Sequence, residues 1–159
     1  MTNKVSTCLW FDGTGEEAAK LYVSLIPGSE LVSAFRPDPD GPPLIVDFTL
    51  GGVPYQALNG GPQFHHSEAA SIVVHTDDQA ETDRLWSGLI AGGGSESMCG
   101  WLRDRFGLSW QIVPRAMIKA LTGADKAGAV RAMDAMMKMN KIDIATIEAA
   151  YRGDAGYRD

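Results

Sequence analysis

The same order of elements occurs twice along this chain, and that repeat limits the possible folds more than any other feature of the sequence. Each copy begins with a strand-like segment, at about Val5 and again at about Ala69, and continues with a helix and further strands. Units of about sixty residues are too long for a solenoid, and two copies are too few. The repeat therefore predicts a pseudo-symmetric domain built from two strand-helix-strand-strand-strand modules.

The first copy shows this order most clearly. Its opening segment, Val5–Phe11, is rich in β-branched and aromatic residues and ends at an Asp-Gly turn. Thr14 and Glu17 have the spacing of a capping box, which predicts a helix that ends at Pro27-Gly28. Gly51-Gly52 suits a two-residue hairpin turn between two of the strands that follow. These strands are predicted at residues 30–36, 44–50 and 53–58.

The second copy repeats the order between Ala69 and Pro114. Asp78 and Glu81 repeat the cap spacing ahead of a second amphipathic helix, and Gly92-Gly93-Gly94 ends that helix. Strands are predicted at residues 69–76, 101–105 and 108–113, with a short, poorly alternating candidate at 95–99.

The C-terminal part has a helical pattern. Asp143 is placed to cap the last helix. Helices are expected at residues 116–121, 125–140 and 144–151.

These segments predict a single domain over residues 1–152, followed by a frayed tail at residues 153–159. The domain is expected to consist of modules at about 5–62 and 68–114 and of C-terminal helices at 115–152.

Composition excludes several classes of function. Fourteen Lys and Arg residues against twenty Asp and Glu residues give a formal net charge of −6, so we expect no nucleic-acid partner. No apolar run is long enough to span a membrane, and the N-terminal residues lack the apolar stretch of a signal peptide. Two cysteines are too few for a disulfide scaffold. We therefore expect a cytoplasmic, reduced protein.

Several short segments together resemble one family. They are Cys8–Gly13, Ala57–Pro62, Cys99–Leu102, Phe106–Pro114 and Lys141–Ile144. Their order is similar to that in the PhnB-like branch of the glyoxalase/bleomycin-resistance group, within the vicinal-oxygen-chelate superfamily. Members of this branch are often labelled demethylubiquinone methyltransferases. The resemblance implies an α+β fold in which two βαβββ modules form a cupped, mixed eight-stranded sheet, usually in a homodimer.

The methyltransferase label does not agree with the first turn of the chain. Most methyltransferases that use S-adenosylmethionine hold it in a doubly wound sheet, beside a glycine-rich turn after the first strand. Here Asp12 leads the turn Asp12–Gly15, and no acidic ribose-binding residue is well placed further along. Methyl transfer is therefore a disfavoured alternative.

The resemblance also implies where a metal would bind. Enzymes of the superfamily place metal ligands on the inner faces of four strands, two from each module. The corresponding positions fall at or near Ser6, Tyr55, Ser71 and Gln111. Hydroxyl and amide groups are weak ligands beside imidazole or carboxylate, so we expect no metal and no other cofactor. A metal-dependent lyase, isomerase or dioxygenase is the alternative.

Period-two alternation along the first strand separates its side chains into two sets. Ser6, Cys8 and Trp10 share one face, whereas Leu9 and Phe11 suit packing against helices. Aromatic walls with few polar groups are typical of ligand sites, so we expect the cup to bind a small apolar or amphipathic molecule. The predicted pocket residues are Ser6, Cys8, Trp10, Tyr55, Asn59, Ser71, His75 and Gln111.

No obvious acid–base pair is present, so the leading hypothesis is a metal-independent protein that binds small molecules, with no assigned reaction. A sequestering protein without chemistry, like the drug-resistance members of the superfamily, is a second hypothesis. His75 is a candidate general base, although local hydrogen bonding is its simpler role. The His65-His66 loop is a candidate lid, and the Met133–Met139 stripe suits a dimer interface. Cys8 and Cys99 are expected to be inert thiols.

Overall fold

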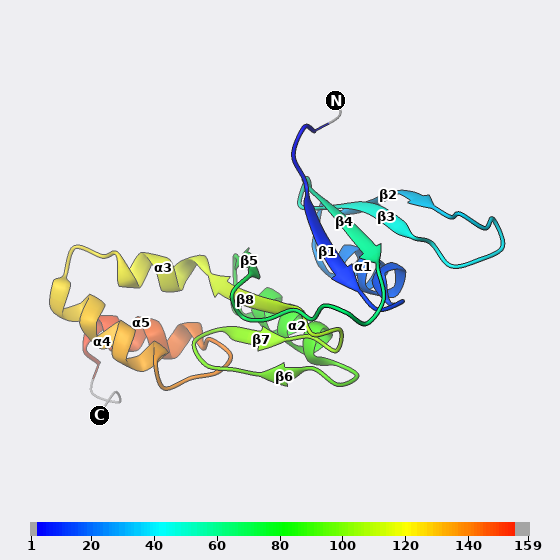
Figure 1. The fold of residues 1–159 in the computed structure, drawn as a ribbon. Coiled ribbons are helices and arrows are strands. Elements are labelled where there is room, and N and C mark those ends of the chain that lie inside the picture. The colour runs from blue at the N-terminus through cyan, green and yellow to red at the C-terminus, as the bar shows by residue number, and fades with distance from the viewer. Residues whose placement is uncertain (1–2, 155–159) are drawn as a thin grey trace. The chain divides into compact units, whose positions relative to one another are not determined.

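A computed structural model describes residues 3–154 of the chain (Figure 1). Within this range the chain forms eight strands and five helices. It divides into two compact units between His66 and Ser67. Both units begin with the order βαβββ, which confirms the predicted α+β fold and its duplication. The predicted union of both sheets into one cup stays a prediction.

The first unit forms a mixed four-stranded sheet with one helix. The strand order is β1-β4-β3-β2, in which β1 is parallel to β4 and the other neighbours are antiparallel. Gly51 and Gly52 have φ of 54° and 84°, as the predicted hairpin turn requires. The elements are β1 (Thr7–Phe11), α1 (Gly15–Leu25), β2 (Glu30–Phe35), β3 (Ile45–Leu50) and β4 (Val53–Asn59).

Helix α1 packs against one face of this sheet, mainly over β3 and β4. Leu9 and Phe11 on β1 are buried, as their alternation predicts. On the helix side, Ala18, Ala19 and Tyr22 are fully buried. Burying one large apolar side chain contributes about 1.5–3 kcal/mol, so this packing decides which face of the sheet stays open.

The N-terminus of α1 is stabilised by a side chain from a distant strand. The predicted capping box is wrong, because the Thr14 side chain makes no capping hydrogen bond. Instead, Asn59 Oδ1 at the end of β4 accepts from the Gly15 N–H at 2.8 Å, and Asn59 Nδ2 donates to the Pro43 carbonyl at 2.9 Å. A Cβ on Gly15 would lie 2.9 Å from Asn59 Oδ1, so a larger residue here would have to displace the Asn59 side chain from this contact.

The second unit begins with the same arrangement, in the strand order β5-β8-β7-β6 with β5 parallel to β8. Asp78 Oδ1 accepts from the Glu81 N–H at 2.8 Å and Glu81 Oε2 accepts from the Asp77 N–H at 2.8 Å, which confirms the predicted cap. The elements are β5 (Ser71–Thr76), α2 (Gln79–Ile90), β6 (Ser95–Glu96), β7 (Trp101–Arg103) and β8 (Ser109–Pro114).

Three further helices continue the second unit beyond β8, where Figure 1 shows them gathered together. They are α3 (Arg115–Leu121), α4 (Lys126–Met136) and α5 (Ile144–Arg152), close to the predicted ranges although α4 ends earlier. Asp143 caps α5 as predicted, since its Oδ1 accepts from the Thr146 N–H at 2.8 Å. None of the helices in residues 3–154 has the length and hydropathy of a membrane span.

The predicted frayed tail lies mostly outside the described residues, which end at Asp154. Gly153 ends α5 in the left-handed conformation, with φ of 74°. The Asp154 N–H donates to the Ala149 carbonyl, so the chain makes a regular helix C-terminus there.

Candidate functional site

The face of the first sheet opposite α1, which we call the first open face, carries an apolar row across all four strands. Strand register places Trp10 beside Leu58, Leu58 beside Ile45, and Ile45 beside Phe35. Directly paired residues project to the same side of a sheet, so these four side chains form one continuous strip. Phe35, at the edge, is 57% exposed.

Trp10 is held firmly in this row by the segment that follows β4. Its Nε1 donates to the Gly61 carbonyl at 2.8 Å, and its ring meets Phe64 edge-on at a centroid distance of 4.9 Å. A Cβ on Gly60 would overlap the Trp10 ring, so only glycine lets the ring lie against this backbone. His66 Nε2 donates to the Trp10 carbonyl at 2.7 Å. The predicted lid segment therefore contacts β1 through His66.

A polar row lies next to the apolar row on the same face. Cys8 is beside Gln56, Gln56 beside Asp47, and Asp47 beside Ser33. The two oxygens of the Asp47 carboxylate each accept one hydrogen bond, from Ser33 Oγ at 2.8 Å and from Gln56 Nε2 at 2.9 Å. The carboxylate is therefore fixed in orientation. Desolvation raises the pKa of the Cys8 thiol, which favours the unreactive protonated form.

A cavity of about 570 Å³ lies at Asp47 and Gln56, the two central members of the polar row. Ser6, which precedes β1, also lines it, as do Phe48 and Tyr55. Its volume is within the range of about 300–1,000 Å³ that is typical of small-molecule sites. The cavity thus contains a carboxylate of fixed orientation, and the apolar row begins two residues further along β3 and β4.

Strand register places Tyr55 and Asn59 on the other side of the sheet from Cys8 and Trp10, although Tyr55 also lines the cavity of about 570 Å³. Tyr55 pairs with Thr7 and Asn59 with Phe11, so both project to the side that α1 covers. The Tyr55 ring stacks on Phe48 at a centroid distance of 5.6 Å, and burial raises the pKa of its hydroxyl. Asn59 serves the N-terminus of α1, as described above.

The remaining predicted pocket residues lie in the second unit, on the face of its sheet opposite α2. Gln111 Nε2 donates to Ser71 Oγ at 2.9 Å, and both residues are half-buried. Gln111 therefore finds a hydrogen-bond partner, as a half-buried glutamine must, in the neighbouring side chain of Ser71. His75 is exposed on β5, where it pairs with Val113.

The side chains at the four predicted ligand positions do not fit a divalent metal. They are Ser6 and Tyr55 in the first unit and Ser71 and Gln111 in the second. Hydroxyl and amide groups bind such ions weakly. Within residues 3–154, no three His, Cys, Asp or Glu side chains are grouped so that they could hold a metal ion.

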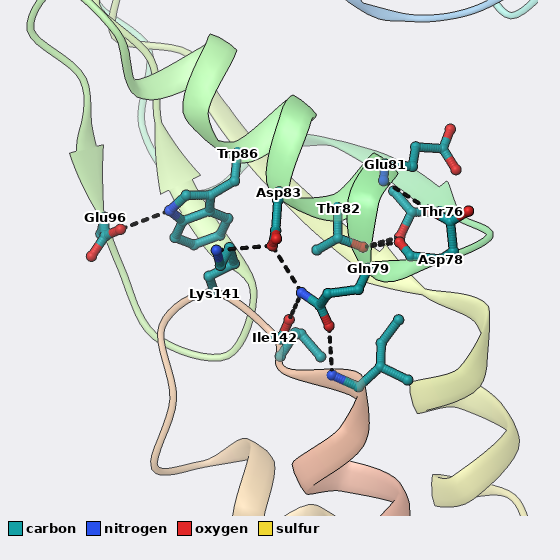
Figure 2. A network of polar contacts seen from close by, with 11 residues as sticks. Thr76, Asp78, Gln79, Glu81, Thr82, Asp83, Trp86, Glu96, Lys141 and Ile142 are labelled. Carbon is teal, nitrogen blue, oxygen red and sulfur yellow. Dashed lines mark hydrogen bonds and ion pairs between the residues drawn. The ribbon is translucent and has the colours of Figure 1, made fainter.

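A separate polar network attaches the C-terminal helices to α2 (Figure 2). Gln79 Nε2 donates to the Ile142 carbonyl at 3.0 Å, and its Oε1 accepts from the Ile144 N–H at 2.8 Å. Lys141 Nζ lies 2.8 Å from Asp83 Oδ1, and hydrogen bonds from Lys141 and Gln79 lower the pKa of Asp83. The Lys141–Ile144 segment is therefore a structural attachment.

Sequence reasoning missed Asp47 and Gln56, the two central members of the polar row. The alternation of Val46, Asp47 and Phe48 indicates only that Asp47 points away from the helix. A polar residue in that position is also typical of a solvated sheet face. The pairing of three strands is needed to see that Ser33 and Gln56 converge on it.

Comparison with known proteins agrees with this architecture. Residues 3–113 match the model of the 3-demethylubiquinone-9 3-methyltransferase family, so α3, α4 and α5 lie beyond the match. A PhnB protein from Bacillus cereus that carries the same description is 32% identical, covers 70% of this chain and 99% of its own, and has a TM-score of 0.64. No match was found among curated proteins.

Two more distant structures share the fold. Protein PA1353 from Pseudomonas aeruginosa is 24% identical over 71% of this chain and 98% of its own, with a TM-score of 0.56. The fosfomycin resistance protein FosX from Mesorhizobium loti is 13% identical over 71% of this chain and 91% of its own, with a TM-score of 0.51. This chain therefore belongs to the 3-demethylubiquinone-9 3-methyltransferase family and shares the fold of the PhnB protein from Bacillus cereus.

Proposed function

We propose that this chain binds a small apolar or amphipathic molecule on the first open face, and that binding requires no metal ion. The observation that carries the proposal is the cavity of about 570 Å³ at Asp47 and Gln56, which lie two residues along β3 and β4 from Ile45 and Leu58 of the apolar row. Trp10 offers a rigid wall, because Gly61 and Phe64 hold its ring. Such a preformed apolar surface binds ligands at a low cost in conformational entropy.

The family name alone does not support a proposal that this chain transfers methyl groups. In the turn after β1, the Gly15 N–H already donates to Asn59, and the mixed sheet lacks the doubly wound order of most S-adenosylmethionine sites. Ser6, Ser71 and Gln111 carry hydroxyl and amide groups, which bind divalent metals weakly. They therefore do not support a metal-dependent lyase, isomerase or dioxygenase. Binding without an assigned reaction is therefore the proposed function.

A serine in place of Leu58 is expected to weaken the binding of a neutral eight-carbon probe, 1-octanol, about tenfold. The substitution removes apolar area from the middle of the row, and about 1.4 kcal/mol corresponds to tenfold in affinity. Binding is measured by NMR titration, with the indole N–H signal of Trp10 as the reporter. Val53→Ser is the matched control, because Val53 lies on the same strand, 52% exposed, and projects to the other side. Its affinity should equal that of the unmodified chain.

The same titration on protein treated with EDTA tests the metal-independent part of the proposal. The affinity for 1-octanol should be unchanged. Loss of binding after EDTA that a divalent ion restores would contradict metal independence. Equal effects of Leu58→Ser and Val53→Ser would contradict the first open face as the binding site.

We also propose that the chain forms a homodimer. Val130, Met133 and Met137 form an apolar stripe on and just after α4, with 61%, 50% and 52% of their surfaces exposed. Apolar side chains that are contiguous on a helix surface are typical of interfaces between subunits. Light scattering during gel filtration at micromolar concentration should give twice the chain mass of 17.1 kDa. A mass of one chain under these conditions would refute the dimer.

A further inference from the structure

We propose that Asp47 makes this site selective for amphipathic amines, with the carboxylate binding a protonated amino group while the apolar row binds the hydrocarbon part. This inference rests on the proposed function and specifies the chemical class of the ligand. It is argued from the orientation of the carboxylate, the charge of the cavity and the spacing of the two rows.

The orientation of Asp47 comes first. Ser33 and Gln56 approach it from β2 and β4, the strands on both sides of β3, and each donates to a different oxygen. A carboxylate has about four acceptor positions, so these two bonds orient the group and leave acceptor capacity for an incoming donor. An ammonium group has three N–H donors and suits such a preorganised acceptor.

The charge of the cavity also favours a cation. Both charged side chains that line it within the described residues, Glu30 and Asp47, are carboxylates. Asp47 is half-buried, so its interaction with an ionic ligand is screened less than it would be in open water. An anionic head group would meet like charge here and would lose affinity.

The spacing of the rows defines the shape of the ligand. Residues two apart on one strand project to the same side, and Gln56 and Leu58 are separated in this way on β4. The polar and apolar rows are therefore about 7 Å apart, at roughly 3.3–3.4 Å per residue. A linear alkylamine with its nitrogen at Asp47 can reach Leu58 and Trp10 with a few methylene groups.

Three eight-carbon probes with different head groups and alkyl tails that differ by no more than one carbon test the proposal: octylammonium, 1-octanol and octanoate at pH 7. Each is titrated into the full chain by NMR, with the Trp10 indole N–H as reporter and that of the buried Trp110 as internal reference. Octylammonium should bind about tenfold more tightly than octanoate. Asp47→Asn should remove most of this preference and leave 1-octanol binding unchanged, since Glu30 is then the remaining carboxylate of the cavity. Asp40→Asn removes the same charge from the exposed loop between β2 and β3, and should keep the preference.

The outcomes separate this inference from the function on which it rests. If 1-octanol shifts the Trp10 signal but octylammonium has no advantage, or keeps its advantage in Asp47→Asn, the role of Asp47 is refuted and the binding site stands. If none of the three probes shifts the Trp10 signal, both the binding site and the role of Asp47 are refuted.

Discussion

Replacing Asp104 with alanine is expected to lower the free energy of unfolding by about 3 kcal/mol or more, the largest effect we expect from one substitution. Asp104 is 2% exposed and lies in the turn between β7 and β8. Its Oδ1 accepts from the N–H groups of Phe106 and Leu108 at 2.9 and 3.0 Å, and its Oδ2 accepts from Trp110 Nε1 at 2.9 Å. Alanine would leave all three donors without this acceptor, each at a cost of about 1–3 kcal/mol.

Urea denaturation followed by tryptophan fluorescence and circular dichroism measures this change. Asp104→Asn keeps one carbonyl oxygen and should lose less stability than Asp104→Ala. The control is Asp134→Ala, an exposed position on α4 where a change within about 0.5 kcal/mol is expected. Equal denaturation midpoints for Asp104→Ala and Asp134→Ala would show that the turn does not depend on the carboxylate.

Ile142→Ala is expected to lower the free energy of unfolding by about 2–5 kcal/mol, the usual range for truncation of a fully buried isoleucine. Ile142 is 0% exposed and packs in the cluster that joins β8 to the C-terminal helices, together with Val113, Met117 and Ile147. The substitution isolates packing, because the hydrogen bond from Gln79 goes to the Ile142 carbonyl, which alanine keeps.

Hydrogen exchange locates the effect of Ile142→Ala, and urea denaturation gives its size. Amides of α3, α4 and α5 should lose protection, while those of β1, β3 and β4 in the first unit should keep it. Ile118→Ala is the matched control, since Ile118 is 41% exposed on α3 and should lose no more than about 1 kcal/mol. Similar stabilities for Ile142→Ala and Ile118→Ala would contradict the role of this cluster.

The elements of the fold could be predicted because local patterns determine them. Leu9 and Phe11 alternate with polar or half-buried residues, which predicts a strand with one buried face. Gly51-Gly52 strongly favours a two-residue hairpin turn of type I′ or II′. The capping of α1 could not be predicted, since the acceptor is Asn59, which lies 44 residues along the chain from Gly15. A Thr-x-x-Glu spacing indicates a cap only when no such distant side chain takes its place.

The candidate site was harder to predict than the fold, because it depends on strand register. A shift of one residue moves every side chain of a strand to the opposite face, and the sequence does not state how β1 and β4 are paired. The alternation of β1 alone predicts that Trp10 lies on the face opposite α1. Tyr55 and its neighbour Gln56 project to opposite sides of the sheet, yet both line the cavity. Asp47 can be recognised as a candidate ligand-binding residue only when strand pairing shows that Ser33 and Gln56 both donate to its carboxylate.

The attachment of the C-terminal helices bears on how this region can evolve. Gln79 contacts the carbonyl of Ile142 and the N–H of Ile144, which are main-chain atoms that every residue except proline offers. Gln79 therefore fixes the position of the main chain at Ile142 and Ile144, whatever side chains these two positions carry. Exposed side chains near α5 can therefore change without loss of this contact, whereas the buried side chain of Ile142 cannot, because it packs in the cluster that joins β8 to the C-terminal helices.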